Sequence, residues 1–372
     1  MIVQLLAGAV LIAAAYQLLA LAGALRHLLK KEPPARATPP VSILKPVRGL
    51  DPGFREAIRS HASIDYPEFE ILFGVEDPAD PAVEEILRLA AEFPQRRILL
   101  VHSVRQAPNH KVAVLMELAA RARHPVLVVN DSDIRVPPDY LHRLVGPLER
   151  PGVGLVTCLY RAWALHEPGR WEALGIATDF APGVLAAPLV GVKEFALGST
   201  LAFRAAELRR IGGFEAIGAW LADDYQLARR IRALGLGVHV SRLVVETALD
   251  ADTWRQAWDH QLRWHRTIRC SRFGGYLGLP VTHATLWALL AALAGMWRPA
   301  AALLALRMTV AAVVGLAVLR SRVAATHFLL VPLRDLAGVV LWAAGLFGSV
   351  VRWRDRRLKL DRSGRIAGSW PA

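Results

Sequence analysis

The feature that most limits how this chain can fold is a regular alternation of β-rich runs and helical stretches between residues 41 and 240. Strands that alternate with helices form mostly parallel sheets, because each helical crossover returns the chain to the same end of the sheet. The sequence therefore predicts an α/β domain over residues 41–252, large enough for a full hydrophobic core. The expected strands are 41–44, 70–75, 98–101, 126–129 and 154–157, and the expected helices are 53–62, 81–92, 111–122 and 138–148.

Apolar segments flank this domain. The chain is 54% hydrophobic and 21% charged, so the excess apolar content is expected in membrane segments. Residues 2–25 are long enough to cross a bilayer. No Lys or Arg precedes them, while Arg26, Lys30, Lys31 and Arg36 follow. We therefore expect a membrane anchor over residues 1–25, with its amino end outside and the following segment in the cytoplasm, rather than a secretory signal.

Two segments of mixed character border the α/β domain. Residues 26–40 are basic and contain Pro33, Pro34, Pro39 and Pro40, which predicts a short stiff linker. Residues 253–274 place several Trp and Arg residues on one expected helix. Such a mixture is typical of a helix that lies in the membrane interface.

The C-terminal third is apolar again. Residues 279–295 and 300–319 are predicted to form two spans, and Arg307 inside the second is expected to face protein or to snorkel. A third apolar stretch covers residues 328–351, and a basic tail, expected in the cytoplasm, covers 352–372. Two spans already return the chain to the cytoplasm. One of the later segments of 275–351 is therefore expected to be interfacial or re-entrant.

Charge and cysteine content narrow the class of protein. A net charge of +13 suits either nucleic acid or an anionic membrane face. The sequence has neither zinc-finger spacing nor the aromatic and basic interleaving of a nucleic-acid module, so we expect a lipid bilayer and no nucleic acid as partner. The two cysteines, Cys158 and Cys270, lie far apart and suit a reducing compartment.

The run Val126–Val129 reads as a buried strand that stops at Asn130, and Asp131 and Asp133 follow directly. Ligands of open α/β sheets bind at the carboxyl ends of such strands. Two acids one residue apart can hold a divalent cation, and a cation with open positions can hold a diphosphate. The alternative is a polar turn without a ligand, and the motif alone leaves both interpretations open.

Two more acidic positions stand at element boundaries. Asp77 follows the second expected strand and can accept a hydrogen bond from a base or ribose, or can simply cap the turn before the next helix. Asp223 and Asp224 open an expected helix. Two adjacent acids exceed what capping requires, so one of them is a candidate general base.

Basic, aromatic and glycine residues supply the remaining candidates. Arg263 offers a planar fork to phosphate, and the neighbouring Trp264 offers a flat face to a sugar or lipid. Gly49, after the first expected strand, lets backbone approach a ligand closely. Lys111 stands at a helix start, where amide groups can meet a diphosphate.

The order of these motifs resembles the D, DxD, (E/D)D and (Q/R)xxRW series of the inverting nucleotide-sugar transferases that include cellulose synthases. The similarity spans roughly residues 41 to 272. It is closer to glucosylceramide synthases and to bacterial hopanoid-biosynthesis glycosyltransferases. The motifs that carry it are Asp77, Asp131-Ser132-Asp133, Asp223-Asp224, Arg263-Trp264, Leu44-Lys45-Pro46-Val47-Arg48-Gly49, Gly198-Ser199-Thr200 and Ile211-Gly212-Gly213-Phe214. In the last motif of the series the first position falls on His260, with Gln261 one place late.

The resemblance implies a GT-A fold with transmembrane helices at both ends and a UDP-sugar donor. It places Asp77 at the uridine, and Asp131 and Asp133 on magnesium or manganese at the diphosphate. It makes Asp224 the base, and Asp223 fills the acidic position before it. Further donor contacts are implied for Pro46, Val47, Gly49, Lys111, Arg263 and Trp264, and acceptor or supporting contacts for Gly198, Ser199 and His260.

The function implied is inverting transfer of a hexose from a UDP-sugar, with UDP-glucose favoured, to a lipid hydroxyl, as in a ceramide glucosyltransferase. A hopanoid acceptor that receives N-acetylglucosamine is the alternative. A non-catalytic membrane scaffold is a further alternative. A processive polysaccharide synthase is disfavoured, because it needs a continuous transmembrane tunnel and the spans after residue 275 are few. The protein is expected to be a multi-pass membrane protein whose catalytic domain is cytoplasmic.

Overall fold

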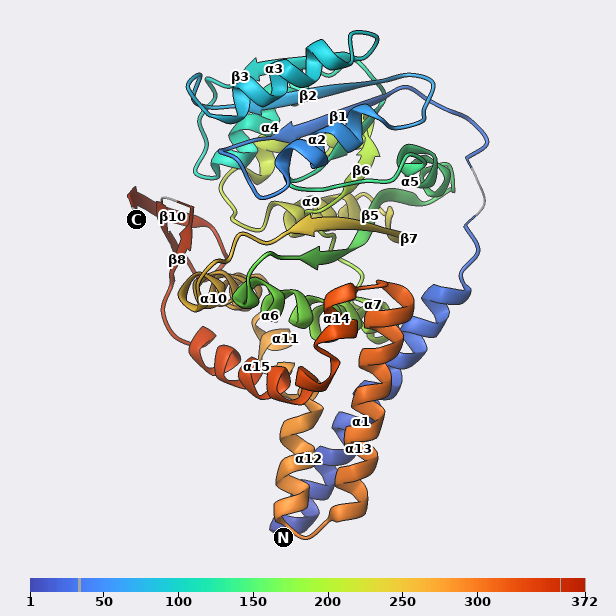
Figure 1. Cartoon of the computed structure of the whole chain (residues 1–372), viewed down its shortest axis with the longest axis vertical. Helices are drawn as coiled ribbons and strands as arrows, with labels where there is room; N and C mark the ends of the chain where they lie inside the picture. Colours follow the sequence, from blue (N-terminus) through green and yellow to red (C-terminus); the bar gives the residue numbers. More distant parts are fainter. Residues whose placement is uncertain (33–34, 355, 372) are drawn as a thin grey trace.

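The structure is a computed structural model that describes residues 1–32, 35–354 and 356–371. Pro33 and Pro34 of the expected linker and Asp355 of the expected tail lie outside the described residues. A seven-stranded sheet forms the centre of the upper domain (Figure 1) in the order β3-β2-β1-β4-β6-β5-β7. Its strands are β1 (Val41–Pro46), β2 (Phe69–Val75), β3 (Arg97–His102), β4 (Val126–Val129), β5 (Val153–Trp163), β6 (Leu201–Arg204) and β7 (Gly237–Ala248).

The sheet is mostly parallel, as the alternation predicts. Strands β3, β2, β1 and β4 run parallel, β6 is antiparallel to both of its neighbours, and β5 and β7 are parallel again. All five expected strands are confirmed, and β6 and β7 are added. Leu44 of β1 pairs with Val129 of β4, and Pro46 pairs with Gly74 of β2. The carboxyl ends of these strands therefore meet at one edge of the sheet.

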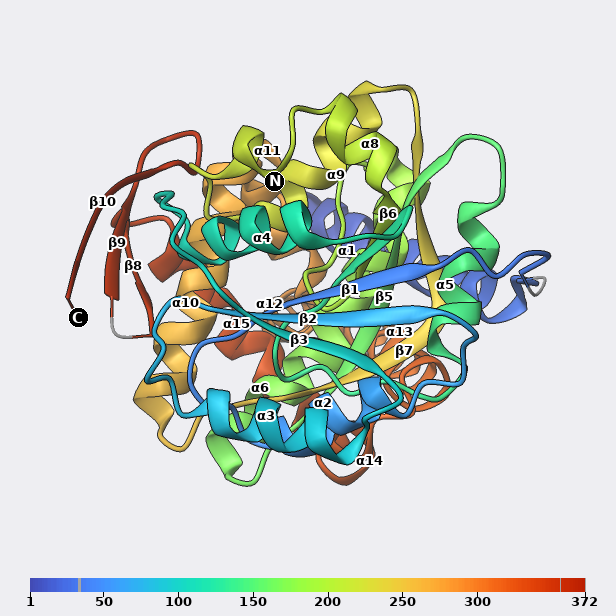
Figure 2. The same ribbon diagram turned by 90° about the horizontal axis from the view of Figure 1, so that it is seen from above.

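Helices pack on both faces of the sheet, as the view from above shows (Figure 2). Successive residues of a strand point to opposite faces: Ile43 belongs to the core under α2, α3 and α5, and Leu44 to the core under α4 and α9. The four expected helices are confirmed. The helices of this domain are α2 (Phe54–Ala62), α3 (Ala82–Glu92), α4 (His110–Arg121), α5 (Tyr140–Leu148), α8 (Ala205–Arg210), α9 (Asp223–Ala233) and the short η3 (Phe214–Ile217).

A long apolar helix that the sequence did not predict lies beneath the sheet (Figure 1). It runs from Glu167 to Val190 through α6 (Glu167–Gly175), the π-helical η1 (Ile176–Phe180), α7 (Ala181–Ala186) and η2 (Ala187–Val190). It is long and apolar enough to cross a membrane, but 61% of its apolar window is buried inside the protein. We refer to this helix as the platform helix. Residues 167–190 lie within the predicted α/β domain, and no separate helix is predicted there. Prolines and glycines are frequent in this stretch, as they are in loops.

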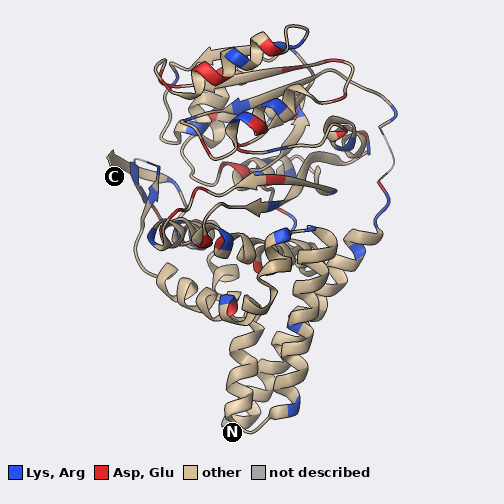
Figure 3. Ribbon diagram, viewed as in Figure 1, with Lys and Arg blue, Asp and Glu red and all other residues tan. Residues whose placement is uncertain are grey.

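A bundle of apolar helices extends away from the α/β domain, with the amino terminus at its far end (Figure 1). It contains α1 (Ile2–Leu29), α12 (Ala284–Leu293) and α13 (Trp297–Ala312), which continues as the π-helical η5 (Val313–Val318). Charged residues are sparse on these helices (Figure 3). By length and composition, Val3–Leu29, Trp297–Val318 and Phe328–Gly345 are candidate membrane spans, as is the platform helix.

The first expected C-terminal span, 279–295, is wrong as a full-length helix. The chain there forms α11 (Phe273–Leu277), the 3-10 turn η4 (Leu279–Thr282) and then α12, which has only 10 residues. At 1.5 Å per residue, α12 covers roughly 15 Å, about half of the hydrocarbon core. The helix-breaking sequence Gly-Leu-Pro at 278–280 explains the shortening.

The third apolar stretch contains α14 (Arg322–Thr326), η6 (Phe328–Leu330) and α15 (Val331–Gly345). Helix α15 lies across the foot of the domain, against α10 (Trp254–Ser271) and α6, rather than along the bundle (Figure 1). The expectation that one of the later segments is interfacial or re-entrant stays a prediction, since Phe328–Gly345 is itself a candidate membrane span. Arg307 faces protein, because its guanidinium lies 2.6 Å from the Asp335 carboxylate and both side chains are buried.

The C-terminal segment that was predicted as a basic tail is folded. It forms a three-stranded antiparallel sheet, β8 (Val350–Trp353), β9 (Arg356–Leu360) and β10 (Ile366–Pro371), which packs on the α/β domain. The Leu221 amide donates to the Gly364 carbonyl at 3.2 Å, and the Ile366 amide donates to the Ala219 carbonyl at 2.8 Å. The alternation buries Val351, Leu358 and Leu360 beside Leu221 while the basic residues between them point outward. The C-terminal sheet is therefore docked against the α/β domain.

Candidate active site

Asn130 anchors the end of β4. Its buried side-chain amide donates to the Tyr140 hydroxyl at 2.7 Å and to the Ser199 carbonyl at 2.7 Å. These bonds join the strand end to the loop that carries Gly198 and Ser199. The loop is thereby held beside Asp131, the next residue along the chain.

Lys111 brings two of the acidic motifs together. Its ammonium group lies 2.7 Å from the Asp131 carboxylate and 3.2 Å from the Asp223 carboxylate. Asn109 caps the start of α4 by accepting from the Val112 amide, which places Lys111 in the first helical turn. Burial lowers the pKa of Lys111, but Asp131 and Asp223 outweigh it and the pKa is raised. The lysine therefore stays protonated between the two carboxylates.

Asp224 lies at the start of α9 and is held by backbone amides. One carboxylate oxygen accepts from Gly198 N at 3.0 Å and the other from Tyr225 N at 2.7 Å. Burial, followed by the neighbouring charge of Asp223, raises the pKa of Asp224 to about 7. A carboxylate with a pKa near neutrality can accept a proton efficiently at physiological pH.

Gly198 is the point at which these groups converge. A Cβ at this position would lie 3.3 Å from an Asp131 oxygen, 3.6 Å from an Asp224 oxygen and 3.7 Å from the Lys111 ammonium. The backbone at Gly198 is thus within contact distance of all three side chains. The absence of a side chain keeps the space between Asp131 and Asp224 open.

Asp131 and Asp133 fit a divalent cation. Burial and the charge of Asp131 raise the pKa of Asp133 to about 7, and the Thr247 hydroxyl donates to it. A cation would relieve this repulsion between carboxylates. No cluster of three or more metal-ligating side chains exists within residues 1–32, 35–354 and 356–371. The protein thus offers two carboxylates and leaves other positions to water or phosphate, as Mg²⁺ prefers.

Lys45 contacts the loop that carries Asp131 and Asp133. The side chain is fully buried at the end of β1, and its ammonium group donates to the Asp131 carbonyl at 2.9 Å. Burial lowers the pKa of Lys45 to about 7, partly offset by Asp133 and Asp131. A lysine within an otherwise apolar strand was the sequence signal for this contact.

The strand ends beyond Lys45 hold the positions expected to meet the nucleoside. Val47 is buried, and its amide donates to the Gly74 carbonyl at 2.8 Å, so the chain after Pro46 still runs along β2. Gly49 has a φ of +69°, which favours glycine, and its amide donates to the Asp80 carboxylate at 2.8 Å. Asp77 accepts from the Ala79 amide at 2.8 Å and so caps the turn. The cap agrees with the simpler of its two predicted roles.

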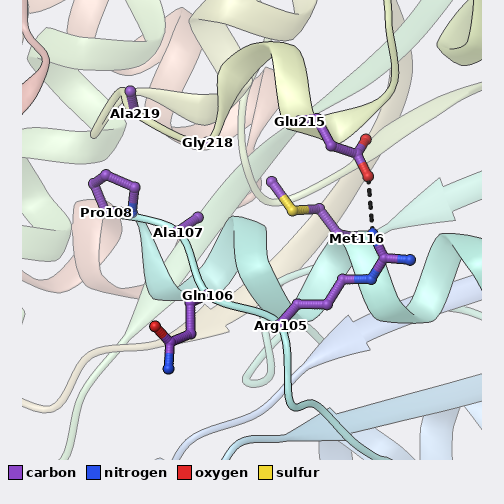
Figure 4. A pocket seen from close by; sticks show the side chains of 8 residues that line it. All are labelled: Arg105, Gln106, Ala107, Pro108, Met116, Glu215, Gly218 and Ala219. Carbon is purple, nitrogen blue, oxygen red and sulfur yellow. Dashed lines mark hydrogen bonds and ion pairs between the residues drawn. The ribbon is translucent and has the colours of Figure 1, made fainter.

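Two open pockets lie on the adjoining rim. The larger, about 710 Å³, is lined by Glu76, Ser103, Val104, Arg105, Gln106, Ala107, Pro108 and His110. The smaller, about 450 Å³, shares residues 105–108 and contains the Arg105–Glu215 ion pair (Figure 4). Asp131, Asp133 and Asp224 line neither pocket. The larger one lies past the ends of β2 and β3, beside the 46–49 segment. The Glu76–His110 pair in it, at 2.7 Å, was not predicted.

Helix α10 (Trp254–Ser271) begins with a capping box formed by Thr253 and Gln256. His260 pairs with the buried Glu172 of the platform helix at 2.5 Å, and its ring lies 5.1 Å from the Trp264 ring. Gln261 instead turns inward and accepts from Arg334 at 2.6 Å. His260 therefore occupies the face of the helix that carries Trp264.

Arg263 points from α10 toward the carboxylate edge. Burial lowers its pKa, and the charges of Glu172 and Asp131 oppose this effect. Its guanidinium forms neither a hydrogen bond nor an ion pair with any other described residue. A half-buried guanidinium whose donors have no partner among the described residues, and on which the charge of Asp131 acts, is suited to binding an anion.

Three comparisons with known proteins agree with this geometry. The model of glycosyl transferase family 21 matches residues 5–366. Ceramide glucosyltransferase 1 of Caenorhabditis elegans is 26% identical over 223 residues, which cover 58% of this chain and 46% of that protein. Ceramide glucosyltransferase of Candida albicans is 32% identical over 107 residues, which cover 25% of this chain and 20% of that protein. This chain thus spans about half, or less, of the length of these curated relatives.

A solved structure shares the fold. It is a mannosyltransferase from Pyrobaculum calidifontis in complex with GDP-Man and Mn²⁺, with a TM-score of 0.56 and 21% identity over 92% of this chain and 96% of that chain. The similarity confirms the expected GT-A-like architecture. The family model extends from the amino-terminal anchor to the last strand of the C-terminal sheet. The chain therefore belongs to glycosyl transferase family 21.

Proposed function

We propose that this protein transfers a hexose from a UDP-sugar, with UDP-glucose favoured, to the hydroxyl group of a ceramide-like lipid, with inversion at the anomeric carbon. The observation that carries the proposal is the convergence of Asp131, Asp224 and Lys111 around the bare backbone of Gly198. A donor-side acid and a candidate base thus border the same open space, and the domain that holds them rests on an apolar platform.

On the donor side, Asp131 and Asp133 would hold magnesium or manganese at the diphosphate. Such a cation neutralises negative charge as UDP leaves. Arg263, with free donors, would stabilise the same charge. Segment 46–49 and Asp77 would bind the uridine, and the free oxygen of Asp77 remains available for this. Mn²⁺ in the related mannosyltransferase supports a divalent cation here.

On the acceptor side, Asp224 would remove the proton of the attacking hydroxyl. Asp223 is occupied by Lys111 at 3.2 Å, whereas Asp224 is held only by backbone amides. Asp224 is therefore the carboxylate that is free to take a proton. A single displacement from the side opposite UDP inverts the sugar carbon.

The platform would present the lipid. Trp264 of α10 contacts Phe180 of the platform helix, with ring centroids 5.9 Å apart, and His260 stands beside Trp264. This aromatic surface lies between the carboxylate edge and the apolar helices. A lipid whose hydroxyl reaches the membrane surface would meet Asp224 there, with Ser199 on the neighbouring loop. The basic residues after α1 place the catalytic domain in the cytoplasm in this proposal.

The test is a transfer assay with purified protein in detergent. Radiolabelled UDP-glucose and UDP-N-acetylglucosamine are each offered with ceramide and with a hopanoid polyol, and the lipid product is identified by mass spectrometry. We expect a β-glucosyl ceramide. A product formed only from the hopanoid and N-acetylglucosamine would establish the alternative acceptor and donor instead. Absence of any glycolipid in all four reactions would contradict the proposal.

A further inference from the structure

The C-terminal sheet lies beside α10 and the α/β domain (Figure 1), and it contacts segments on two sides of the loop that carries Asp131 and Asp133. At its start, Arg266 of α10 donates to the Val350 carbonyl, and Arg269 donates to the Gly348 carbonyl at 2.6 Å. Near its end, the backbone bonds of Gly364 and Ile366 hold residues 219–221, which lie one residue before Asp223 and Asp224. Trp220 in that loop lies between two guanidinium groups, those of Arg230 at 5.0 Å and Arg365 at 4.4 Å.

Arg354, between β8 and β9, reaches the opposite side of the edge. Its backbone has a φ of +52°, a conformation that side chains other than glycine rarely adopt. Its guanidinium donates to both carboxylate oxygens of Asp51, at 2.8 and 3.1 Å. Asp51 in turn accepts from the Ser132 hydroxyl at 2.5 Å. Ser132 stands between Asp131 and Asp133, so three contacts link residue 354 to the metal-binding loop.

The charges explain why this link matters. Asp51 is only 13% exposed and acts electrostatically on both Asp133 and Lys45. Without a partner it would be a third carboxylate beside a pair that already repel each other. The Arg354 guanidinium neutralises Asp51, and because one of its nitrogens, Nη2, donates to both carboxylate oxygens, it also restricts the orientation of the carboxylate. The fixed carboxylate then holds Ser132, and with it the backbone between the two acids.

We propose that Arg354 is a positioning residue of the donor site, which acts through Asp51 and Ser132 to set the geometry of Asp131 and Asp133. The C-terminal sheet is then a part of the active site. The inference rests on the proposed function, in which these two carboxylates hold the metal and the donor diphosphate. Residues that orient metal ligands in this way typically change metal affinity or activity by about 10–100-fold when they are replaced.

The experiment compares Arg354→Ala, Arg354→Lys and the control Arg357→Ala in the full-length protein in detergent. Arg357 is exposed on β9, and its side chain has no hydrogen-bond or ion-pair partner within the described chain, so the control removes the same charge from the same sheet. Mn²⁺ binding is titrated by electron paramagnetic resonance, without and with UDP. Initial rates give KM for the UDP-sugar and for the lipid separately.

We expect Arg354→Ala to raise the Kd for Mn²⁺ and the KM for the UDP-sugar by about tenfold. The KM for the lipid should stay within twofold, and Arg357→Ala should resemble the wild type. Arg354→Lys should recover part of the loss, because lysine restores the charge but carries it on a flexible and more strongly hydrated ammonium group. If Arg354→Ala does not fold, Ser132→Ala removes the last contact of the link with a smaller change, and the same rise in Kd is expected.

The outcomes separate this inference from the proposed function. If Arg354→Ala and Ser132→Ala bind Mn²⁺ as tightly as the wild type does, the positioning role is overturned, even if both variants are less active. If Asp131→Asn binds Mn²⁺ as tightly as the wild type does, the proposed metal site is overturned. The inference, which rests on that site, is then overturned as well. Equal losses in Arg354→Ala and Arg357→Ala would show a general charge effect and would also overturn the positioning role.

Discussion

Replacing Asp224 with asparagine is expected to abolish transfer and, above pH 4, to stabilise the folded protein. The pKa of Asp224 is raised from 3.8 to about 7, first by burial and then by Asp223. Each pKa unit corresponds to about 1.4 kcal/mol, so full ionisation of Asp224 costs roughly 4 kcal/mol of folding free energy. The side chain keeps some solvent exposure and Lys111 partly compensates its charge, so about 2–4 kcal/mol is a reasonable range.

The pH dependence has a definite sign. Below pH 3.8 the carboxyl group is protonated in both the folded and the unfolded chain, and Asp224→Asn changes stability little. Between pH 3.8 and about 7 the unfolded chain has released the proton and the folded chain retains it, so wild-type stability falls as the pH rises. The stability difference between variant and wild type should therefore grow across this window and level off above pH 7.

Thermal unfolding in detergent with EDTA measures this difference without interference from metal. For a domain of about 200 residues, 2–4 kcal/mol corresponds to a rise in Tm of roughly 4–16 °C. Asp65→Asn, on the exposed surface of the catalytic domain, is the matched control and should show no such trend. A constant or negative difference from pH 4 to 8 would refute the burial argument. Full transfer activity in Asp224→Asn, with UDP-sugar binding intact, would refute its assignment as the base.

Three further outcomes are expected. Arg307→Met should destabilise the detergent-solubilised protein by about 3–5 kcal/mol, because it leaves the buried Asp335 carboxylate without its partner. The double variant Arg307→Met with Asp335→Leu should be closer to wild type in thermal unfolding. Gly198→Ala should lower kcat/KM by at least about tenfold, since the added Cβ enters the space beside Asp131. The control Gly183→Ala should leave kcat/KM unchanged, and equal kcat/KM values for Gly198→Ala and the wild type would contradict the prediction. EDTA should stop transfer and Mn²⁺ should restore it, and persistent activity in EDTA would reject a metal-dependent step.

The sequence by itself determined the features that depend on neighbouring residues. An apolar run such as 126–129 is expected to be buried in a sheet, and Asp131 and Asp133 come just after it. The position of these two carboxylates at the end of a strand was therefore predictable from one short segment. The same holds for the long apolar helix α1 and for helix α10, whose cap and composition are local signals. The order of the acidic motifs and the Arg263-Trp264 motif along the chain predicted the family.

The platform helix shows where local signals fail. Its prolines and glycines resemble those of a loop, and its apolar residues lie within the stretch assigned to the α/β domain. Burial against α1, α13 and the sheet stabilises it as a helix, and those contacts come from distant parts of the chain. The length of α12 likewise depends on the turn before it, which the hydropathy of residues 279–295 concealed.

Only the tertiary structure decided which side chains meet. It placed Gly198 against Asp131 and Asp224, turned Gln261 away from the active-site face and His260 toward it, and brought Arg354 to Asp51 across 303 residues of sequence. Such contacts have no local signature, because an exposed basic tail and a docked one have the same composition. What distinguishes them is the apolar face of β8–β10, whose burial beside Leu221 holds Arg354 at the edge where the two acids stand.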